Sequence, residues 1–197
     1  MERKKLNQSV KFSFVMIVTL AFLHACGSVP FTGRRQLNLV SNEQVVALSL
    51  QQYQEFMRTA PVERSTTNAE MVKRVGSRVA NAVETFYKNN GYESELQYYQ
   101  WEFNLVKDNS VNAFAMPGGK IVIFEGLLPV TQTEEALAVV VGHEVAHVIA
   151  RHSQERISQQ MALQYGGAVA GGLLGNSVGS QIGQQVFGLG AQFGVMM

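Results

Sequence analysis

Two histidines and a glutamate in the second half of the chain have the residue types and the spacing of a metal-dependent hydrolase. His143 and His147 are four residues apart, and Glu144 directly follows the first histidine. On a helix, residues four apart lie on the same face, so both imidazoles can reach one tetrahedral metal ion. A zinc ion would lower the pKa of a bound water, and Glu144 would accept its proton. The pattern predicts zinc-dependent peptide-bond hydrolysis, with His143 and His147 as ligands and Glu144 as the catalytic base.

A peptidase zinc site normally has three protein ligands, and the residues around the motif do not provide the third. On a helix that continues past the motif, His152 lies about 7.5 Å beyond His147 and about 140° around the axis, so it cannot bind the same ion. Glu155 lies farther along that helix, and no histidine or carboxylate follows it. We therefore expect the third ligand to be absent from this chain. Two explanations stay open: truncation of a longer protein, which we favour, or a product with an incomplete site.

The motif is expected to lie in a long helix over 131–165, which begins with a capping box formed by Thr131 and Glu134. Apolar residues recur at helical spacing on both sides of the motif. After Arg156 the sequence has no charged residue, and glycines stand at every fourth position over 167–183. On a helix these glycines would form a ridge for close packing, whereas a flexible loop explains the composition equally well.

Two helices and three strands are expected before the motif helix. The helices cover 41–58, where Ser41 and Gln44 form a capping box, and 68–91. Alternating apolar residues and turn residues predict strands at 101–106, 111–116 and 121–124. Because short turns connect these strands, we expect an antiparallel meander. The fold class is therefore α+β, with a small antiparallel sheet packed on the long motif helix and further helices flanking it.

The beginning of the chain has the features of an export signal. Basic residues precede an apolar run over 12–23, which is too short to cross a membrane comfortably. The sequence Leu23-His24-Ala25-Cys26 then resembles a bacterial lipobox, and Cys26 is the only cysteine. We expect a lipidated Cys26 and three regions: a lipoprotein signal peptide over 1–25, a tether over 26–40, and a metallopeptidase domain over 41–197 that is incomplete at its C-terminus. The alternative is an uncleaved signal anchor with a buried cysteine.

Several motifs, in a fixed order, make the chain resemble a known family. They are Cys26, Val29-Pro30 with Thr32-Gly33-Arg34, the segment 112–119, and the motif 143–147 followed by Arg151 and His152. This combination is similar to the bacterial lipoprotein branch of the HtpX-like and CAAX-prenyl-protease-like zinc metallopeptidases. The resemblance implies a zincin-like fold and one bound zinc ion (Zn²⁺), whose third ligand would be a glutamate on a later helix.

The same resemblance implies roles for two further segments. It places five residues along the active-site cleft, where their backbone would pair with an extended substrate: Asn112, Ala113, Phe114, Ala115 and Met116. It also implies that Arg151 and His152 end the motif helix and act structurally, not as zinc ligands.

The function that these features favour is a metalloendopeptidase tethered to the membrane by a lipid anchor. Its substrates would be misfolded or unassembled envelope polypeptides, and it would face the periplasm of a Gram-negative bacterium. Two alternatives remain, a non-catalytic, chaperone-like lipoprotein that binds clients and the poorly folded product of a decayed gene. A formal net charge of +1 without a long basic block argues against a nucleic-acid partner.

Overall fold

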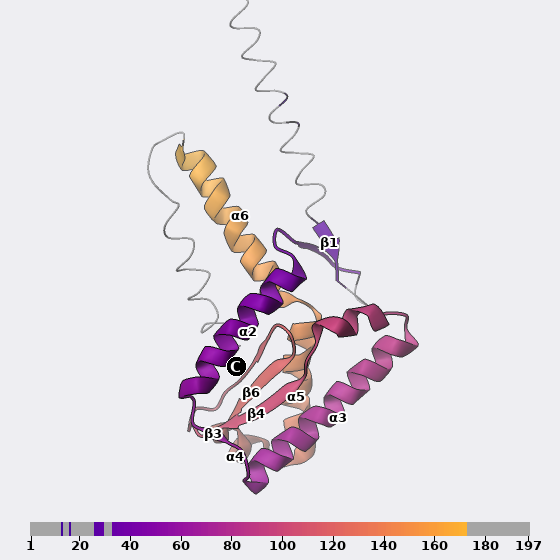
Figure 1. Cartoon of the computed structure of the whole chain (residues 1–197), viewed down its shortest axis with the longest axis vertical. Helices are drawn as coiled ribbons and strands as arrows, with labels where there is room; N and C mark the ends of the chain where they lie inside the picture. Colours follow the sequence, from indigo (N-terminus) through magenta and orange to yellow (C-terminus); the bar gives the residue numbers. More distant parts are fainter. Residues whose placement is uncertain (1–12, 14–15, 17–25, 30–32, 173–197) are drawn as a thin grey trace, which may run out of the picture.

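The computed structural model describes residues 13, 16, 26–29 and 33–172 (Figure 1). Its elements follow one another in this order: β1 Cys26–Ser28, β2 Arg35–Leu37, α2 Asn42–Thr59, β3 Val62–Glu63, α3 Thr67–Asn89, the 3-10 helix η1 Glu93–Tyr98, β4 Glu102–Val106, β5 Ala113–Met116, β6 Lys120–Phe124, the 3-10 helix η2 Glu125–Leu127, α4 Leu128–Thr131, α5 Glu134–Ile149 and α6 His152–Gly172. Apart from residues 13 and 16, the expected signal peptide lies outside the described residues. The glycine-rich stretch beyond residue 172 also lies outside them.

The main sheet has four strands in the order β3-β4-β6-β5. β4 and β6 are parallel, whereas β5 pairs antiparallel with β6 and β3 pairs antiparallel with β4. The α+β class is confirmed, but the expected antiparallel meander is wrong. After β4 the chain crosses to the far edge of the sheet and forms β5 there. β6 then returns between the two earlier strands, in the same direction as β4.

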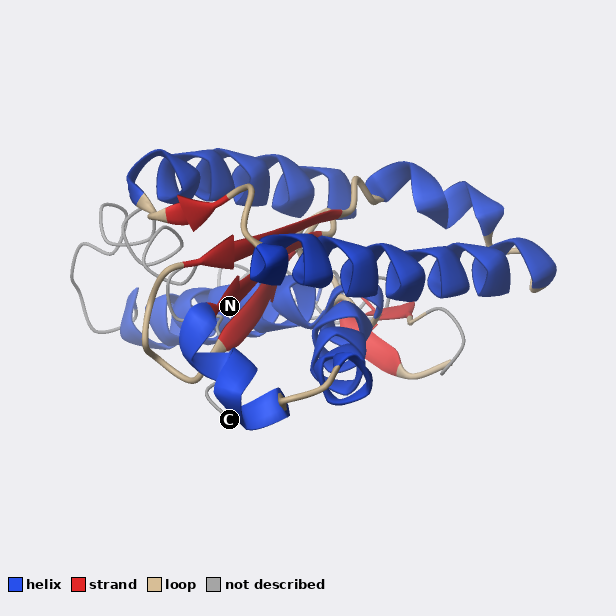
Figure 2. Ribbon diagram, turned by 90° about the horizontal axis from the view of Figure 1, so that it is seen from below, coloured by secondary structure: helices blue, strands red, loops and turns tan. Residues whose placement is uncertain are grey.

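Helices cover both faces of this sheet (Figures 1 and 2). α3 and α5 pack on one face, where the larger apolar cluster includes Ile121 of β6. α2 packs on the other face, where Tyr53 belongs to a second apolar cluster with Val122 of the same strand. Because alternate residues of a strand point to opposite faces, burial on both sides explains the unbroken apolar run of β6. Gly76 allows α3 to approach closely, since a side chain there would overlap the ring of Phe103.

Local capping interactions set the starts of the helices. The capping box of α2 is confirmed, because the backbone N–H of Gln44 donates to the Ser41 hydroxyl and the backbone N–H of Ser41 donates to the Gln44 side chain. The expected box at Thr131 and Glu134 is wrong. Thr131 ends α4, and Thr133 instead caps α5 by accepting a backbone hydrogen bond in the first turn.

The helix that carries the motif is broken, whereas one continuous helix was expected. α5 ends at Ile149 and α6 begins at His152. Between them Arg151 has a φ of 53°, in the left-handed region, where a right-handed helix cannot continue. Its guanidinium pairs with Glu95 of η1 and lies over the ring of Tyr98. These tertiary contacts stabilise the break and are absent from any local sequence pattern.

β1 and β2 form a small antiparallel pair within the stretch expected to be a tether. This pair lies beside the beginning of α6, and α6 projects away from the body of the domain (Figure 1). Within the described residues, none of the helices has the length and apolar character needed to cross a bilayer.

Candidate active site

His143 and His147 lie one turn apart on α5, and their rings meet edge to face, with an interplanar angle of 82°. Their Nε2 atoms are 2.9 Å apart and their ring centroids are 4.6 Å apart. Two nitrogens bound to one tetrahedral zinc ion at about 2.0–2.1 Å would lie about 3.3 Å apart. The two Nε2 atoms are therefore near the separation that a shared ion requires, and His143 is exposed to solvent. This part of the donor set fits zinc.

Glu144 is buried beside β5, with 2% of its surface exposed. Its carboxylate accepts a hydrogen bond from the backbone N–H of Ala115. Burial raises the pKa of Glu144 to about 7, and the hydrogen bond from Ala115 opposes this shift. A carboxyl group whose pKa lies near neutrality can both accept and release a proton at working pH, which general acid–base catalysis requires.

The other ring nitrogen of His147 contacts His152, the first residue of α6. The two Nδ1 atoms are 2.5 Å apart, so one ring donates a hydrogen bond to the other. The Nε2 atom of His147 thus faces His143, and its Nδ1 atom faces His152. The three imidazole rings form a row and do not converge on one point. Burial, assisted by the neighbouring histidines, lowers the pKa of His147, which favours the neutral form that binds metals. In the part of the chain that the structure describes, no three His, Cys, Asp or Glu side chains surround a common metal position.

β5 is the edge strand of the sheet and runs beside α5. The carbonyl of Asn112, just before β5, accepts a hydrogen bond from a backbone N–H of β6 at 3.0 Å. Because bonded and non-bonded pairs alternate along antiparallel strands, the backbone groups of Phe114 and Met116 also face β6. Those of Ala113 and Ala115 then face the free edge. The N–H of Ala115 already donates to Glu144, so the free edge of β5 borders the site directly.

The side chains of the expected substrate segment divide between the two faces of the sheet. Phe114 packs edge-on against Phe56 of α2, with ring centroids 5.4 Å apart, and Met116 is buried in the same apolar cluster. Ala113 and Ala115 lie in the cluster on the α5 face. The structure therefore brings the backbone of Ala113 and Ala115 to the site, whereas the side chains of Phe114 and Met116 point toward α2.

A cavity of about 280 Å³ adjoins the motif on the side of α6. It is lined by Ala115, Glu144, His147, Val148, His152, Ser153, Glu155, Arg156 and Gln159. Glu155 in this lining accepts two hydrogen bonds from Arg34. The backbone of Cys26, the expected lipidation site, pairs with Leu37 in the β1–β2 sheet.

Sequence reasoning missed two contacts of the site. The His147–His152 contact requires the helix to break, and the prediction of a continuous helix placed the two rings on different faces. The Arg34–Glu155 pair joins residues 121 positions apart. The only sequence signal for it was the presence of Arg34 in one of the motifs shared with known metallopeptidases.

Comparison with known proteins finds a family and several proteases that are similar to this chain. The model of the family described as Peptidase family M48 matches residues 66–196. The mitochondrial metalloendopeptidase OMA1 of Schizosaccharomyces pombe is 36% identical over 135 residues, which cover 66% of this chain and 36% of that protein. Its namesake in Saccharomyces cerevisiae is 29% identical, with 66% and 39% covered. The beta-barrel assembly-enhancing protease of Yersinia pestis is 28% identical over 146 residues, with 74% and 28% covered. The chain thus spans less than two fifths of the length of each of these relatives.

Proposed function

Because the chain belongs to Peptidase family M48, we propose that it is a zinc metalloendopeptidase in which His143 and His147 bind one zinc ion and Glu144 is the catalytic base. The observation that carries this proposal is the meeting of the two Nε2 atoms beside a buried carboxylate at the free edge of β5. A zinc ion bound there would supply Lewis-acid chemistry, polarising the peptide carbonyl and making water more acidic.

The protein's own groups then have distinct tasks. Glu144 would take a proton from the attacking water and pass it to the departing amine. The N–H of Ala115 holds this carboxylate on the β5 side of α5. His152 contacts the outer nitrogen of His147 and so fixes the orientation of that ring, as groups behind metal ligands commonly do.

We propose that the substrate binds as an extended segment along β5. The outward-facing backbone of Ala113 and the carbonyl of Ala115 offer partners for such a strand, and the segment from Asn112 to Met116 forms this binding edge. Backbone pairing provides affinity with little demand on side chains. It therefore suits polypeptides that have lost or not yet reached their native structure.

The cellular setting follows from two weaker observations. The name of the Yersinia pestis relative connects that protein with beta-barrel assembly, which supports envelope polypeptides as substrates here. The lipobox-like sequence ending at Cys26 supports a lipid anchor, a location facing the periplasm, and a place in the lipoprotein branch of the HtpX-like and CAAX-prenyl-protease-like peptidases.

Cleavage of an unfolded protein by the wild type and by Glu144→Gln tests the activity. Removing a general base lowers kcat by roughly 10²- to 10⁴-fold. Glu135→Gln is the matched control, because Glu135 is an exposed carboxylate on the same helix. We expect the control to cleave like the wild type and chelation to abolish cleavage.

The same assay separates the alternatives. Equal cleavage by Glu144→Gln and the wild type would overturn the assignment of the base. A wild-type protein that retains an unfolded client after chelation, and never cleaves it, would favour the chaperone-like function.

A further inference from the structure

The segment just before α2 is bound to α6 by two buried polar side chains. The amide of Gln154 donates to the carbonyl of Val40 at 2.7 Å, and the hydroxyl of Ser158 accepts from the N–H of Leu39 at 3.0 Å. Gln154 and Ser158 are only 4% and 0% exposed. Buried polar groups need hydrogen-bond partners, and separating α6 from the segment 34–40 would leave these groups without them. The two hydrogen bonds therefore hold α6 and this segment together.

Arg34 adds a two-point ion pair between this segment and α6. Its two terminal nitrogens lie 2.8 Å and 2.6 Å from the two carboxylate oxygens of Glu155. One of them is also 3.4 Å from the side-chain oxygen of Gln36, which is itself buried. A bidentate guanidinium–carboxylate pair fixes orientation as well as distance. Arg34 therefore holds Glu155 in a defined position.

Glu155 lies in the first turn of α6, the same turn that begins with His152. The N–H of Glu155 donates to the carbonyl of Arg151 at 3.1 Å, which closes this turn directly after the left-handed break. His152 and Glu155 are three residues apart, so they share a face of the helix, and both line the cavity beside His147. A shift of this turn would therefore move the ring of His152 relative to His147.

We infer that Arg34 is a positioning residue of the metal site, acting through Glu155 and His152 on the ring of His147. The Arg34–Glu155 pair holds the first turn of α6, and the contact of Arg151 with Glu95 of η1 holds the break just before it. An exposed ion pair contributes little to global stability, and 44% of the Arg34 side chain is exposed. Its effect is therefore local. The inference rests on the proposed function only in taking His147 as a ligand.

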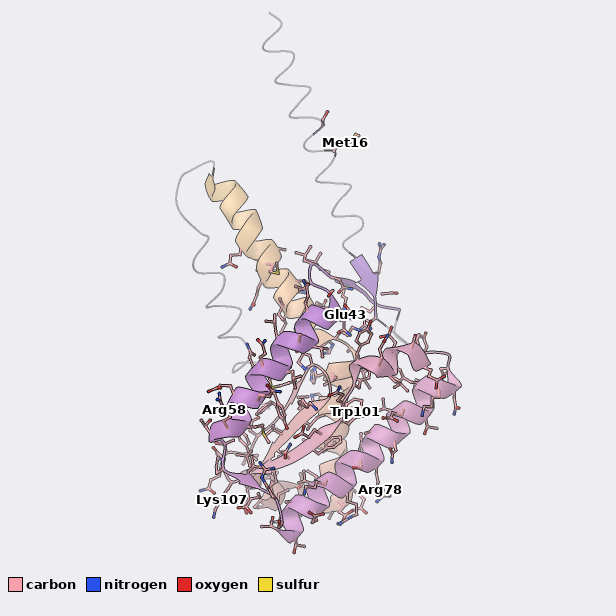
Figure 3. The ribbon with its side chains drawn as sticks, in the orientation of Figure 1. Met16, Glu43, Arg58, Arg78, Trp101 and Lys107 are labelled. Carbon is pink, nitrogen blue, oxygen red and sulfur yellow. The ribbon has the colours of Figure 1, made fainter. Side chains whose placement is uncertain are left out.

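Zinc affinity of the full chain, measured by competition with a chelator, tests the inference. Partners behind metal ligands typically change metal affinity by about 10- to 100-fold, and we expect about a tenfold loss for Arg34→Glu. The charge-swapped double variant Arg34→Glu/Glu155→Arg should recover most of the loss. Arg58→Glu is the matched control, because Arg58 makes a 2.6 Å pair with Glu55 at the end of α2 remote from α6 (Figure 3). It should bind zinc like the wild type.

A double-mutant cycle tests the route through His152. His152→Asn should lose zinc affinity, and adding Arg34→Glu to it should cause little further loss. Thermal unfolding of each variant checks that the fold persists. Wild-type zinc affinity in Arg34→Glu, or a loss that adds fully to that of His152→Asn, would overturn the inference.

Nitrogen NMR of the imidazole rings gives a readout that needs no metal. Arg34→Glu should alter the resonances of the His147–His152 contact, whereas Arg58→Glu should not. If the wild type bound no zinc at His143 and His147, the proposed function would fail, and this measurement would still decide the role of Arg34. Unchanged ring resonances in Arg34→Glu would contradict that role.

Discussion

Glu102, at the start of β4, is the centre of a polar group on the α2 face of the sheet. Its carboxylate accepts hydrogen bonds from the Tyr53 hydroxyl at 2.7 Å and from the Asn104 amide at 2.9 Å, and Lys120 lies 3.3 Å away. Burial raises the pKa of Glu102, but the hydrogen bonds from Tyr53, Asn104 and Lys120 outweigh it and the net shift is downward. The folded protein therefore favours the ionised form.

This arrangement makes stability depend on pH in acid. A carboxyl group whose pKa is lower in the folded state stabilises the protein above its unfolded pKa, and this contribution is lost as pH falls through the folded value. We expect the free energy of unfolding to fall below about pH 4.5, the ordinary pKa of a glutamate. Glu102→Gln should weaken this dependence, as urea unfolding at about pH 7 and about pH 3 would show.

Glu93→Gln provides the control for this experiment, because Glu93 is an exposed carboxylate in η1. It should keep the pH dependence of the wild type. If Glu102→Gln lost stability in acid as steeply as the wild type, the polar group would not be the source of the effect.

The histidines show how far single residues could be predicted. The spacing of His143 and His147 sufficed to place them on one helical face, since helical periodicity is a local property. The contact of His147 with His152 was not predictable, because it requires the left-handed conformation of Arg151. That conformation is stabilised by Glu95, 56 positions earlier in the chain.

At the scale of elements, the positions of the helices and strands in the sequence were largely predictable. The order of the strands within the sheet was not. The capping box at Ser41 and Gln44 and the apolar periodicity of α3 are local signals, and both helices lie within a residue or two of their expected limits. Strand order depends instead on which edge the chain reaches after β4. The turns that suggested a meander are equally compatible with a β5–β6 hairpin added to a parallel β4–β6 pair.

The close packing of α3 against β4 gives a test at this scale. A Cβ atom at Gly76 would lie 2.2 Å from the ring of Phe103, so Gly76→Ala must displace the ring or the helix. Overpacking of a core typically costs about 1–3 kcal/mol, and we expect a loss of that size in the free energy of unfolding. Chemical denaturation would measure it.

Gly142→Ala is the matched control, because Gly142 lies in α5 with open space around its Cβ position. Alanine has the higher helix propensity, by about 1 kcal/mol in exposed positions, so this variant should be as stable as the wild type or slightly more stable. Equal stability of Gly76→Ala and Gly142→Ala would mean that α3 moves aside without cost.

At the scale of the whole molecule, the strand pair β1–β2 lies beside the beginning of α6 (Figure 1), and α6 begins with His152 of the candidate site. The strand pair β1–β2 begins at Cys26, and the following residues bind α6 through Arg34, Leu39 and Val40. The expectation of a tether over 26–40 came from composition, and composition does not contain these long-range contacts. A lipid on Cys26, as proposed, would hold the site near the membrane surface.

Substitution of Cys26 tests the anchor. In cells supplied with labelled palmitate, the wild type should incorporate label and Cys26→Ser should not, because only a thiol can form the thioether of a lipoprotein. Ser28→Ala, an exposed position in the same strand, is the control and should be labelled like the wild type. Absence of label from the wild type would contradict lipidation.

The hydrogen bond from Ala115 to Glu144 has a consequence for selectivity. The proposed base, Glu144, is hydrogen-bonded to β5, the strand that would pair with the substrate. The same strand would therefore fix both the position of the proton acceptor and the register of the bound substrate. A helical segment cannot use such a strand, since its own N–H and C=O groups are already bonded within the helix. The enzyme would then select clients by the conformation of their backbone. A stable domain would escape cleavage until a few of its residues opened, and the rate of cutting would report how often they do.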